Sequence, residues 1–373
     1  MPVPVRTPSP APLFPPLTVS EVDAARTSAW YDTFEDITFA ASIVDIDALG
    51  EREAFLEWLH SDSIFMPEDD EAGPSRQSSP DPEAPVYRLP KTSAAIRAAL
   101  RKYGGAVFPK LNWTSPRDAA FLLPQTEFGP LHCISPDDVY LLLKSSDFIQ
   151  HDLDPERAYE GCVGADAGAE SPPEPRIELV LKKFVELNPA CEVRCFVRDN
   201  ILLAVSHRDT NYYDHLQDPE VQQKLVDNVR AFWEDEVRGD YAGGDDYIFD
   251  LYIDERNTSA TIMDFQPYRP ATDSYLFSYP ELQQIFVRAQ APIPDGGDDR
   301  PRLPLLRVID SAAHPEANRN APTFSANMMP LEMLEMSQGR SLAELQEAWE
   351  AAVAAGMAGG GDDDDESDDD SVE

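Results

Sequence analysis

The sequence predicts a mixed α/β fold, of the α+β type, for a globular protein whose two ends differ in composition from its centre. The chain has 373 residues, 42% of them hydrophobic, which is enough to bury a core in one large or two medium domains. Helical periodicity marks two stretches before residue 150, whereas apolar and polar residues alternate after Pro175. A half that mixes helix and loop followed by a mostly antiparallel half favours this class.

Proline-rich and acidic segments divide the chain into four regions. Residues 1–26 begin proline-rich without a sustained apolar run, so we expect them to be disordered rather than to form a signal peptide. We place a first subdomain at 27–175, with an acidic, proline-punctuated loop at 65–85, and a second, mostly antiparallel subdomain at 176–337. Residues 338–373 are expected to form a short helix and a disordered acidic tail.

Two helices and two hairpins give the clearest local patterns. KTSAAIRAALRKYGG, from Lys91, predicts an amphipathic helix ended by glycines, and SPDDVYLLLKSSDF, from Ser135, predicts a helix with a serine cap. RIELVLKKFVEL, from Arg176, alternates like a strand. EVRCFVRDNILLAVSHRD and YIFDLYIDERNTSATIMDFQP each predict two strands, joined at RDN and at ERNTS.

Charge is the most unusual property of the composition. The chain carries 69 acidic against 30 basic residues, a net charge of −39, and its last fifteen residues hold nine of the acids. Such a field repels nucleic-acid phosphates and attracts a basic protein, so we expect no direct binding to nucleic acid. We find no apolar run of the length that a membrane span needs, and the net charge favours a monomer.

Several other polar or sulfur-bearing residues are expected to be structural. The four cysteines, Cys133, Cys162, Cys191 and Cys195, lack metal-ligand spacing and indicate a reducing, cytosolic or nuclear setting. We expect Cys191 and Cys195 to be core thiols. His207, Asp209 and His215 could form a catalytic loop, but no nucleophile motif accompanies them, so a polar turn is preferred. Trp30 and Tyr31 are expected to be packing residues.

The second hairpin carries the candidate metal ligands. A side-chain period of two puts Asp264 and Gln266 on one face of their strand, together with Ile262. If the register sets Asp250 opposite Asp264, two carboxylates and an amide oxygen converge, and a cation between them would relieve the repulsion. An oxygen-only set of this kind suits magnesium. The alternative is that both aspartates lie on a solvated face of the sheet.

Cations on neighbouring strands are candidates for phosphate binding. Lys182 and Lys183 sit inside an otherwise apolar strand, so one of them points to each face, and Arg194 lies in the next strand. An interior lysine needs an anion, and a ligand phosphate is one candidate. Pairing with nearby glutamates is equally open, and these are Glu178, Glu186 and Glu192.

A third set of candidates lies in GGAVFPKLNWTSPRDAAFL. Lys110 and Asn112 fall two apart on one face of an extended stretch, and Pro116 begins a turn toward Arg117 and Asp118. The preceding glycines do not form a phosphate-binding loop, since its glycine-lysine-serine ending is absent. Together with the acidic hairpin, the cations are the parts expected of a magnesium-nucleotide cleft between two lobes.

Longer blocks of the chain resemble a known family. The blocks FPKLNWTSPRDA, LVLKKFVELNPACEVRCFVRDN, SHRDTNYYDH, YIFDLYID and MDFQPYRPATDSYLFSYPEL are similar to those of the cell division cycle protein 123 family, and TSAWYDTF resembles its amino-terminal signature. The resemblance runs in order from about Thr27 to the region of Asn327. It implies an ATP-grasp fold with ATP and magnesium between two α/β subdomains. It also implies a cytoplasmic assembly factor that binds the gamma subunit of translation initiation factor 2.

The resemblance also implies roles for individual residues. Positions expected to meet the ATP phosphates or adenine are Lys110, Asn112, Asp118, Lys182 and Arg194, with the hinge backbone at Lys183, Phe184 and Val185. Asp250 and Asp264 would hold magnesium. Where the family pattern has asparagine two residues after the second aspartate, this chain has Gln266, whose extra methylene would require a shifted backbone or a bridging water.

The sequence leaves two classes of function open. The first is an ATP- and magnesium-binding assembly chaperone, for which the family blocks and the acidic surface argue. The second is a ligase or kinase that activates a carboxylate, as many ATP-grasp proteins do, although the sequence offers no obvious acceptor pocket. A plain scaffold that keeps the fold without the nucleotide is a third reading, supported by Gln266.

Overall fold

The fold is described from a computed structural model of the chain. The described residues are 11–61, 66–68, 86–121, 128–163, 172–256, 258–291, 302–311 and 314. All of them belong to one compact unit of the chain. Most of the predicted loop at 65–85 and the whole of 338–373, with its predicted helix and acidic tail, lie outside these residues.

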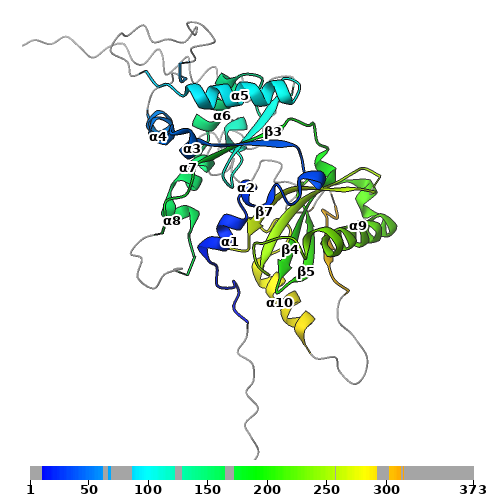
Figure 1. Ribbon diagram of the computed structural model, residues 1–373. Helices are drawn as coiled ribbons and strands as arrows, with labels where there is room; N and C mark the ends of the chain where they lie inside the picture. Colours follow the sequence, from blue (N-terminus) through cyan, green and yellow to red (C-terminus); the bar gives the residue numbers. More distant parts are fainter. Residues whose placement is uncertain are drawn as a thin grey trace, which may run out of the picture. The chain divides into compact units, whose positions relative to one another are not determined.

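The first sheet has three antiparallel strands, in the order β1-β3-β2. β1 (Ala41–Asp45) and β2 (Val107–Leu111) both pair with the central strand β3 (Glu178–Lys183) (Figure 1). The prediction that the second subdomain begins at residue 176 is therefore wrong for β3, which completes the sheet of the first subdomain. The strand itself was predicted, but the order of strands in a sheet depends on contacts that are distant in sequence.

Helices cover one face of the first sheet and share a core with it. Leu179 and Leu181 of β3 point into this core, where they join Trp58, Ile96 and Tyr140. Both helices predicted before residue 150 are present; the second is capped by Ser135 and Asp138 in a capping box and ends before a separate helix that begins at Asp147. The helices are α3 (Ile46–Leu49), α4 (Arg52–His60), α5 (Pro90–Lys102), α6 (Pro136–Lys144), α7 (Asp147–Leu153) and α8 (Pro155–Ala158), with the 3-10 turn η2 (Asp118–Phe121).

The second sheet has five strands, in the order β7-β6-β4-β5-β8. Its strands are β4 (Glu192–Arg198), β5 (Ile201–His207), β6 (Tyr247–Ile253), β7 (Ala260–Pro267) and β8 (Leu305–Arg307). Only the β5–β8 pair is parallel. Both predicted hairpins are confirmed, and Asp199 and Asn200 turn the first one with positive φ angles of 49° and 55°.

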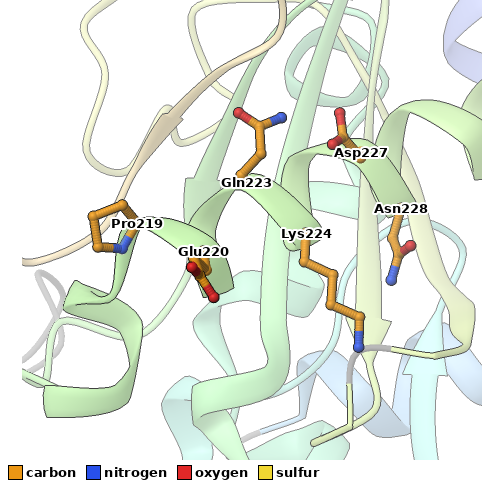
Figure 2. A pocket seen from close by; sticks show the side chains of 6 residues that line it. All are labelled: Pro219, Glu220, Gln223, Lys224, Asp227 and Asn228. Atoms are coloured by element: carbon orange, nitrogen blue, oxygen red, sulfur yellow. The ribbon is translucent and has the colours of Figure 1, made fainter.

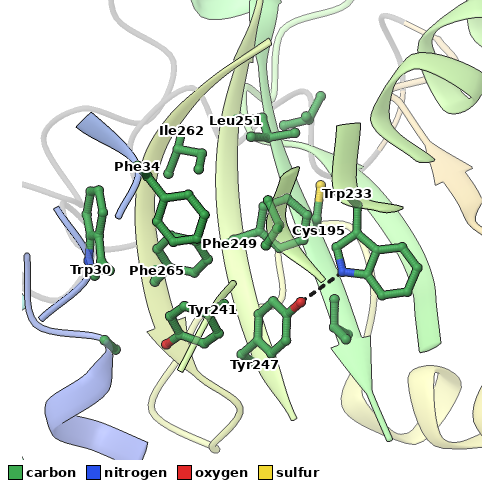
Figure 3. Close-up of a cluster of buried hydrophobic side chains, with 14 of the residues drawn as sticks. Trp30, Phe34, Cys195, Trp233, Tyr241, Tyr247, Phe249, Leu251, Ile262 and Phe265 are labelled. Atoms are coloured by element: carbon green, nitrogen blue, oxygen red, sulfur yellow. Dashed lines mark hydrogen bonds between the residues drawn. The ribbon is translucent and has the colours of Figure 1, made fainter. Parts of the chain in front are cut away.

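The two faces of the second sheet pack against different helices. One face meets Val229 of α9 (Pro219–Phe232) and Trp233 of the π-helical turn η5 (Trp233–Val237), whose indole nitrogen donates to the Tyr247 hydroxyl over 2.8 Å (Figure 3). The other face meets Leu282 and Phe286 of α10 (Tyr279–Gln290). The 3-10 turns η3 (Pro189–Cys191) and η4 (Asp214–Gln217) precede β4 and α9. Among the described residues no helix has the length and apolar character that a membrane span requires.

The amino-terminal segment is helical where the sequence predicts disorder. α1 (Val19–Ala24), α2 (Thr27–Trp30) and the 3-10 turn η1 (Glu35–Ile37) pack onto the core between the sheets, so the prediction of disorder for 1–26 is wrong for the residues of α1. Thr18 and Glu21 form a reciprocal capping box that starts α1. The proline-rich residues just before it obscured this start signal.

Candidate functional site

Asp250 and Asp264 lie directly opposite each other on β6 and β7, as the hairpin predicts. Their strand neighbours Phe249 and Phe265 are fully buried in the core on the other face of the sheet (Figure 3). Ile262 also belongs to that core, so the prediction that it shares the face of Asp264 is wrong. The register shifts at this point, because Asp250 pairs with Asp264 while the next residue of β6 pairs with Ile262, and the extra residue forms a β-bulge.

Arg194 extends the acidic pair into a row across three strands. It lies opposite Asp250 in the β4–β6 ladder and binds both of its carboxylate oxygens, Nε to Oδ1 over 2.7 Å and Nη2 to Oδ2 over 2.8 Å. A second guanidinium, that of Arg208, lies 3.7 Å from Oδ2. Asp250 is only 2% exposed, and although burial alone would raise its pKa, the two arginines lower that pKa to about 2.

Asp264 is bound by a lysine from the first sheet. Nζ of Lys110, on β2, lies 2.5 Å from both carboxylate oxygens of Asp264, and the lysine is 1% exposed. Nε2 of Gln266 donates to one of these oxygens over 3.1 Å. The alternative of two aspartates on a solvated face is therefore wrong, because each carboxylate lies against a cation.

The two lysines of β3 have different surroundings, as the alternation predicts. Lys182 donates from Nζ to the carbonyl oxygen of Met263 over 2.6 Å, and burial lowers its pKa to about 8. Lys183 is exposed. Two of the three proposed glutamate partners are engaged elsewhere: Glu178 accepts from Ser28, and Glu192 accepts from Arg208.

Of residues 183–185, predicted as a hinge, Lys183 is the last residue of β3 and the other two follow it. The backbone amides of Lys183 and Phe184 donate to Ala40 and Ala106, which continues the pairing with the neighbouring strands. The Phe184 ring lies 4.5 Å from the ring of His132, and Val185 is 41% exposed.

The structure does not bring Asn112 and Asp118 into the charged row. Asn112 donates from Nδ2 to Arg176 O over 2.6 Å and accepts from the amide of Glu178, which ties the end of β2 to the start of β3. Asp118 accepts from the Ser146 hydroxyl and from the first amides of α7, so it caps that helix. The hydrogen bonds of both side chains join parts of the fold.

The loops beside the row supply Arg208 and Tyr275, which the sequence did not single out. A cavity of about 200 Å³ is lined by Arg117, Pro189, Glu192, Arg208, Asp209 and Tyr275. Arg208 stands between His207 and Asp209, the two residues of this motif that we considered from the sequence. His207 is buried, with one ring nitrogen near Asp209 O and the other near Ala190 O, which agrees with the structural reading preferred above.

A larger hollow, of about 470 Å³, lies along α9 (Figure 2). All of its lining residues come from that one helix: Pro219, Glu220, Gln223, Lys224, Asp227 and Asn228. Lys224 donates to Arg256 O, and Asp227 pairs with Arg230 and Arg302. This hollow gathers no side chains from separate elements and lies outside the charged row.

The remaining sequence candidates are structural in the described part of the chain. Cys191 and Cys195 are buried and unbridged, and burial raises the pKa of both thiols. Trp30 packs edge-on against Phe265 with ring centroids 5.3 Å apart, and Tyr31 accepts from the amide of Ala41. These contacts confirm the interpretation of the two aromatic residues as packing residues.

The oxygen donors of the row suit magnesium only in company with other ligands. Asp250, Asp264 and Gln266 are of the chemical type that magnesium prefers, but Arg194 and Lys110 hold the two carboxylates, and Gln266 turns its amide nitrogen toward Asp264. No group of three or more His, Cys, Asp or Glu side chains among the described residues is arranged to hold a metal. The described protein ligands alone therefore do not complete a magnesium site.

The fold and this row define the class of protein. It is an α/β protein with two mostly antiparallel sheets, in which Lys110 of the first sheet binds the carboxylate of Asp264 and Lys182 binds the carbonyl oxygen of Met263 in the second. The D123 family model matches residues 30–337. The chain belongs to the D123 family.

Curated relatives and a solved structure agree with this assignment. The chain is 32% identical to the translation initiation factor eIF2 assembly protein of Schizosaccharomyces pombe, over 90% of this chain and 96% of the relative. It is 30% identical to the eIF2 assembly protein of Emericella nidulans, over 87% and 88%. The structure of C-terminally truncated Cdc123 from S. pombe matches 80% of this chain and 100% of that one, with a TM-score of 0.59 and 31% identity. The predicted resemblance to the cell division cycle protein 123 family is confirmed.

Proposed function

We propose that this protein is an assembly factor for translation initiation factor eIF2. The support is the function named for its relatives in S. pombe and E. nidulans, to which it is similar over 87–90% of its length. As finer parts of this proposal, the partner subunit is gamma, the protein works in the cytoplasm as a monomer, and its role supports translation initiation and cell-cycle progression. A net charge of −39 suits a basic partner surface.

We further propose an ATP-grasp arrangement with a magnesium-ATP site at the charged row. The observation that carries this proposal is the convergence of Lys110 and Lys182 from one sheet on Asp264 and Met263 of the other, beside Arg194 and Asp250. Lysines on flexible stems can exchange a protein acceptor for a phosphate oxygen. The bidentate pair of Arg194 and Asp250 is held rigidly and forms one side of the proposed site.

Each group in the row has a proposed part in holding the nucleotide. Lys110 and Lys182 bind phosphate oxygens, and magnesium shared between Asp264 and those oxygens would neutralise part of their charge. The amide oxygen of Gln266 can reach the ion through a water. Binding of this kind orders the two sheets around one ligand, which is what an assembly factor requires of ATP if it does not consume it.

Calorimetric titration with magnesium-ATP tests the nucleotide site. The expected result is saturable binding by the wild type that Asp264→Ala abolishes and that Asp235→Ala, a change on the exposed surface of η5, leaves intact. Absence of binding by the wild type would overturn the nucleotide site. Steady ATP turnover that requires an added carboxylate acceptor would instead favour the ligase or kinase alternative.

Co-purification with the isolated gamma subunit tests the partner. We expect a complex at low salt that dissociates as the ionic strength rises, because the attraction is between an acidic surface and a basic one. No complex at low salt would contradict the proposed partner.

A further inference from the structure

The cavity of about 200 Å³ beside the charged row has no assigned role in the proposal above. Arg117, Arg208 and Tyr275 line it together with Glu192 and Asp209. These residues come from the turn after β2, from β4, from the loop after β5 and from the loop between β7 and α10. A cavity built from so many separate elements is a better candidate for a ligand site than a hollow along one helix.

The acidic groups at this cavity already have donors from the protein. Glu192 accepts from Nη1 of Arg208 over 2.6 Å. Asp209 accepts from the side chain of Asn211 and from the Tyr213 hydroxyl. With their acceptor atoms engaged in this way, the carboxylates do not call for a cation in the cavity.

Two hydrogen-bond donors at the cavity remain without an acceptor in the described part of the chain. The guanidinium of Arg117 is exposed and makes no hydrogen bond or ion pair with any described residue. The Tyr275 hydroxyl accepts from Nε of Arg208 over 3.3 Å, and since an arginine can only donate, the hydroxyl proton of Tyr275 is still available. Because these two donors are unused and the nearby carboxylates already have donors, the cavity favours a ligand that accepts hydrogen bonds.

The backbone conformation of Tyr275 is a second indication of a ligand site. Its φ angle is 49°, in the left-handed region that a tyrosine rarely adopts, and its amide donates to the Asp273 side chain over 2.8 Å. The ring lies near two guanidinium groups, with its centroid 4.8 Å from that of Arg194 and 5.7 Å from that of Arg208. The surroundings thus hold this hydroxyl in place at the cavity.

We propose that Arg117, Arg208 and Tyr275 form an oxyanion subsite that receives the terminal phosphate of the nucleotide. A cavity of about 200 Å³ is smaller than the ~300 to 1,000 Å³ of pockets that enclose whole small molecules, so it has room for one phosphate group and not for a nucleotide. Arg208 also lies 3.7 Å from Asp250, which places the subsite next to the row. This inference rests on the proposed nucleotide site and adds that the protein distinguishes ATP from ADP.

Calorimetry with magnesium-ATP, magnesium-ADP and inorganic phosphate tests the subsite. The wild type is expected to bind ATP at least about tenfold more tightly than ADP, the effect of one or more hydrogen bonds to a charged group. Arg117→Gln and Tyr275→Phe should each reduce the affinity for ATP by about tenfold and leave that for ADP unchanged. Matched changes at exposed positions, Arg288→Gln and Tyr212→Phe, should alter neither affinity.

The possible results distinguish the phosphate subsite from the nucleotide site as a whole. Equal affinity of the wild type for ATP and ADP would overturn the subsite and leave the nucleotide site standing. Binding of neither nucleotide would overturn both. Equal weakening of ATP and ADP in the variants would show a structural role only. Saturable binding of inorganic phosphate that is lost in Arg117→Gln, with ATP and ADP bound equally, would assign the subsite to free phosphate and overturn its link to the nucleotide.

Discussion

Replacing Arg194 with methionine tests whether the row across the second sheet depends on charge pairing. The change removes both hydrogen bonds to Asp250, of 2.7 and 2.8 Å, and the bond of 2.7 Å from Nη1 to Asp273 O. Asp250 then remains 98% buried, with the guanidinium of Arg208 at 3.7 Å as its nearest cation.

The size of the effect follows from that burial. Breaking a buried ion pair by removing one partner costs about 3–5 kcal/mol, because the other charge is left without compensation. Arg208 is close enough to relieve part of this cost, so we expect a loss near the lower end, about 3 kcal/mol of the free energy of unfolding.

Urea unfolding at neutral pH measures this loss from the shift in midpoint. The dependence on urea should stay the same, because the surface exposed on unfolding does not change. The double variant Arg194→Met with Asp250→Leu should lose less than Arg194→Met alone, since no buried charge is left unpaired. Arg288→Met, an exposed change on α10, should stay within about 0.5 kcal/mol of the wild type. A loss below about 1 kcal/mol for Arg194→Met would refute the reasoning.

Three further outcomes are expected. The wild type should lose about 2 kcal/mol more stability than Asp250→Asn as the pH falls from about 5 to about 2, because the folded-state pKa of Asp250, about 2, lies below the ordinary aspartate pKa of 3.8; unfolding curves across this range check it, and parallel curves would contradict it. Asp118→Ala should cost about 1–2 kcal/mol by uncapping α7, and unchanged ATP affinity in calorimetry would separate that role from the predicted contact with the nucleotide. Gln266→Asn should tighten magnesium-dependent ATP binding by roughly tenfold, with Gln223→Asn on α9 as its control; a weaker affinity would mean that the longer amide is the better fit.

Local pairing in this fold was predictable from the sequence wherever short turns fix the neighbour. The ERNTS turn makes β6 and β7 partners, and alternation then brings Asp250 and Asp264 together. The RDN turn does the same for β4 and β5. In both hairpins the partner strand lies within about ten residues, so nothing distant had to be known.

The order of strands and the register at the bulge were not predictable in the same way. β3 joins β1 and β2, which lie at least 60 residues before it, and no local pattern records that choice. At the bulge, the buried position of Ile262 breaks the period of two because the core needs both Ile262 and Phe265 on one side. Strict alternation from Asp264 therefore assigns Ile262 to the wrong face.

Dependence on distant contacts also explains why the sequence indicated some residues of the site and not others. Lys110, Lys182 and Arg194 stand inside strands, where a charge in an apolar pattern attracts notice. Arg117, Arg208 and Tyr275 stand in loops, where charged and aromatic residues are ordinary, and only the folding of three loops onto one cavity sets them apart.

Cations are concentrated at the site, although the chain as a whole is strongly acidic. Five cations (Lys110, Lys182, Arg117, Arg194 and Arg208) gather beside four carboxylates (Asp250, Asp264, Glu192 and Asp209), whereas the chain carries 69 acids against 30 bases. A free nucleotide with several negative charges is repelled at long range by such a chain and attracted only once it reaches these cations. Magnesium reduces the charge that has to approach. On the proposed function, the metal therefore assists the encounter as well as the bound state, and it does so without a complete set of protein ligands.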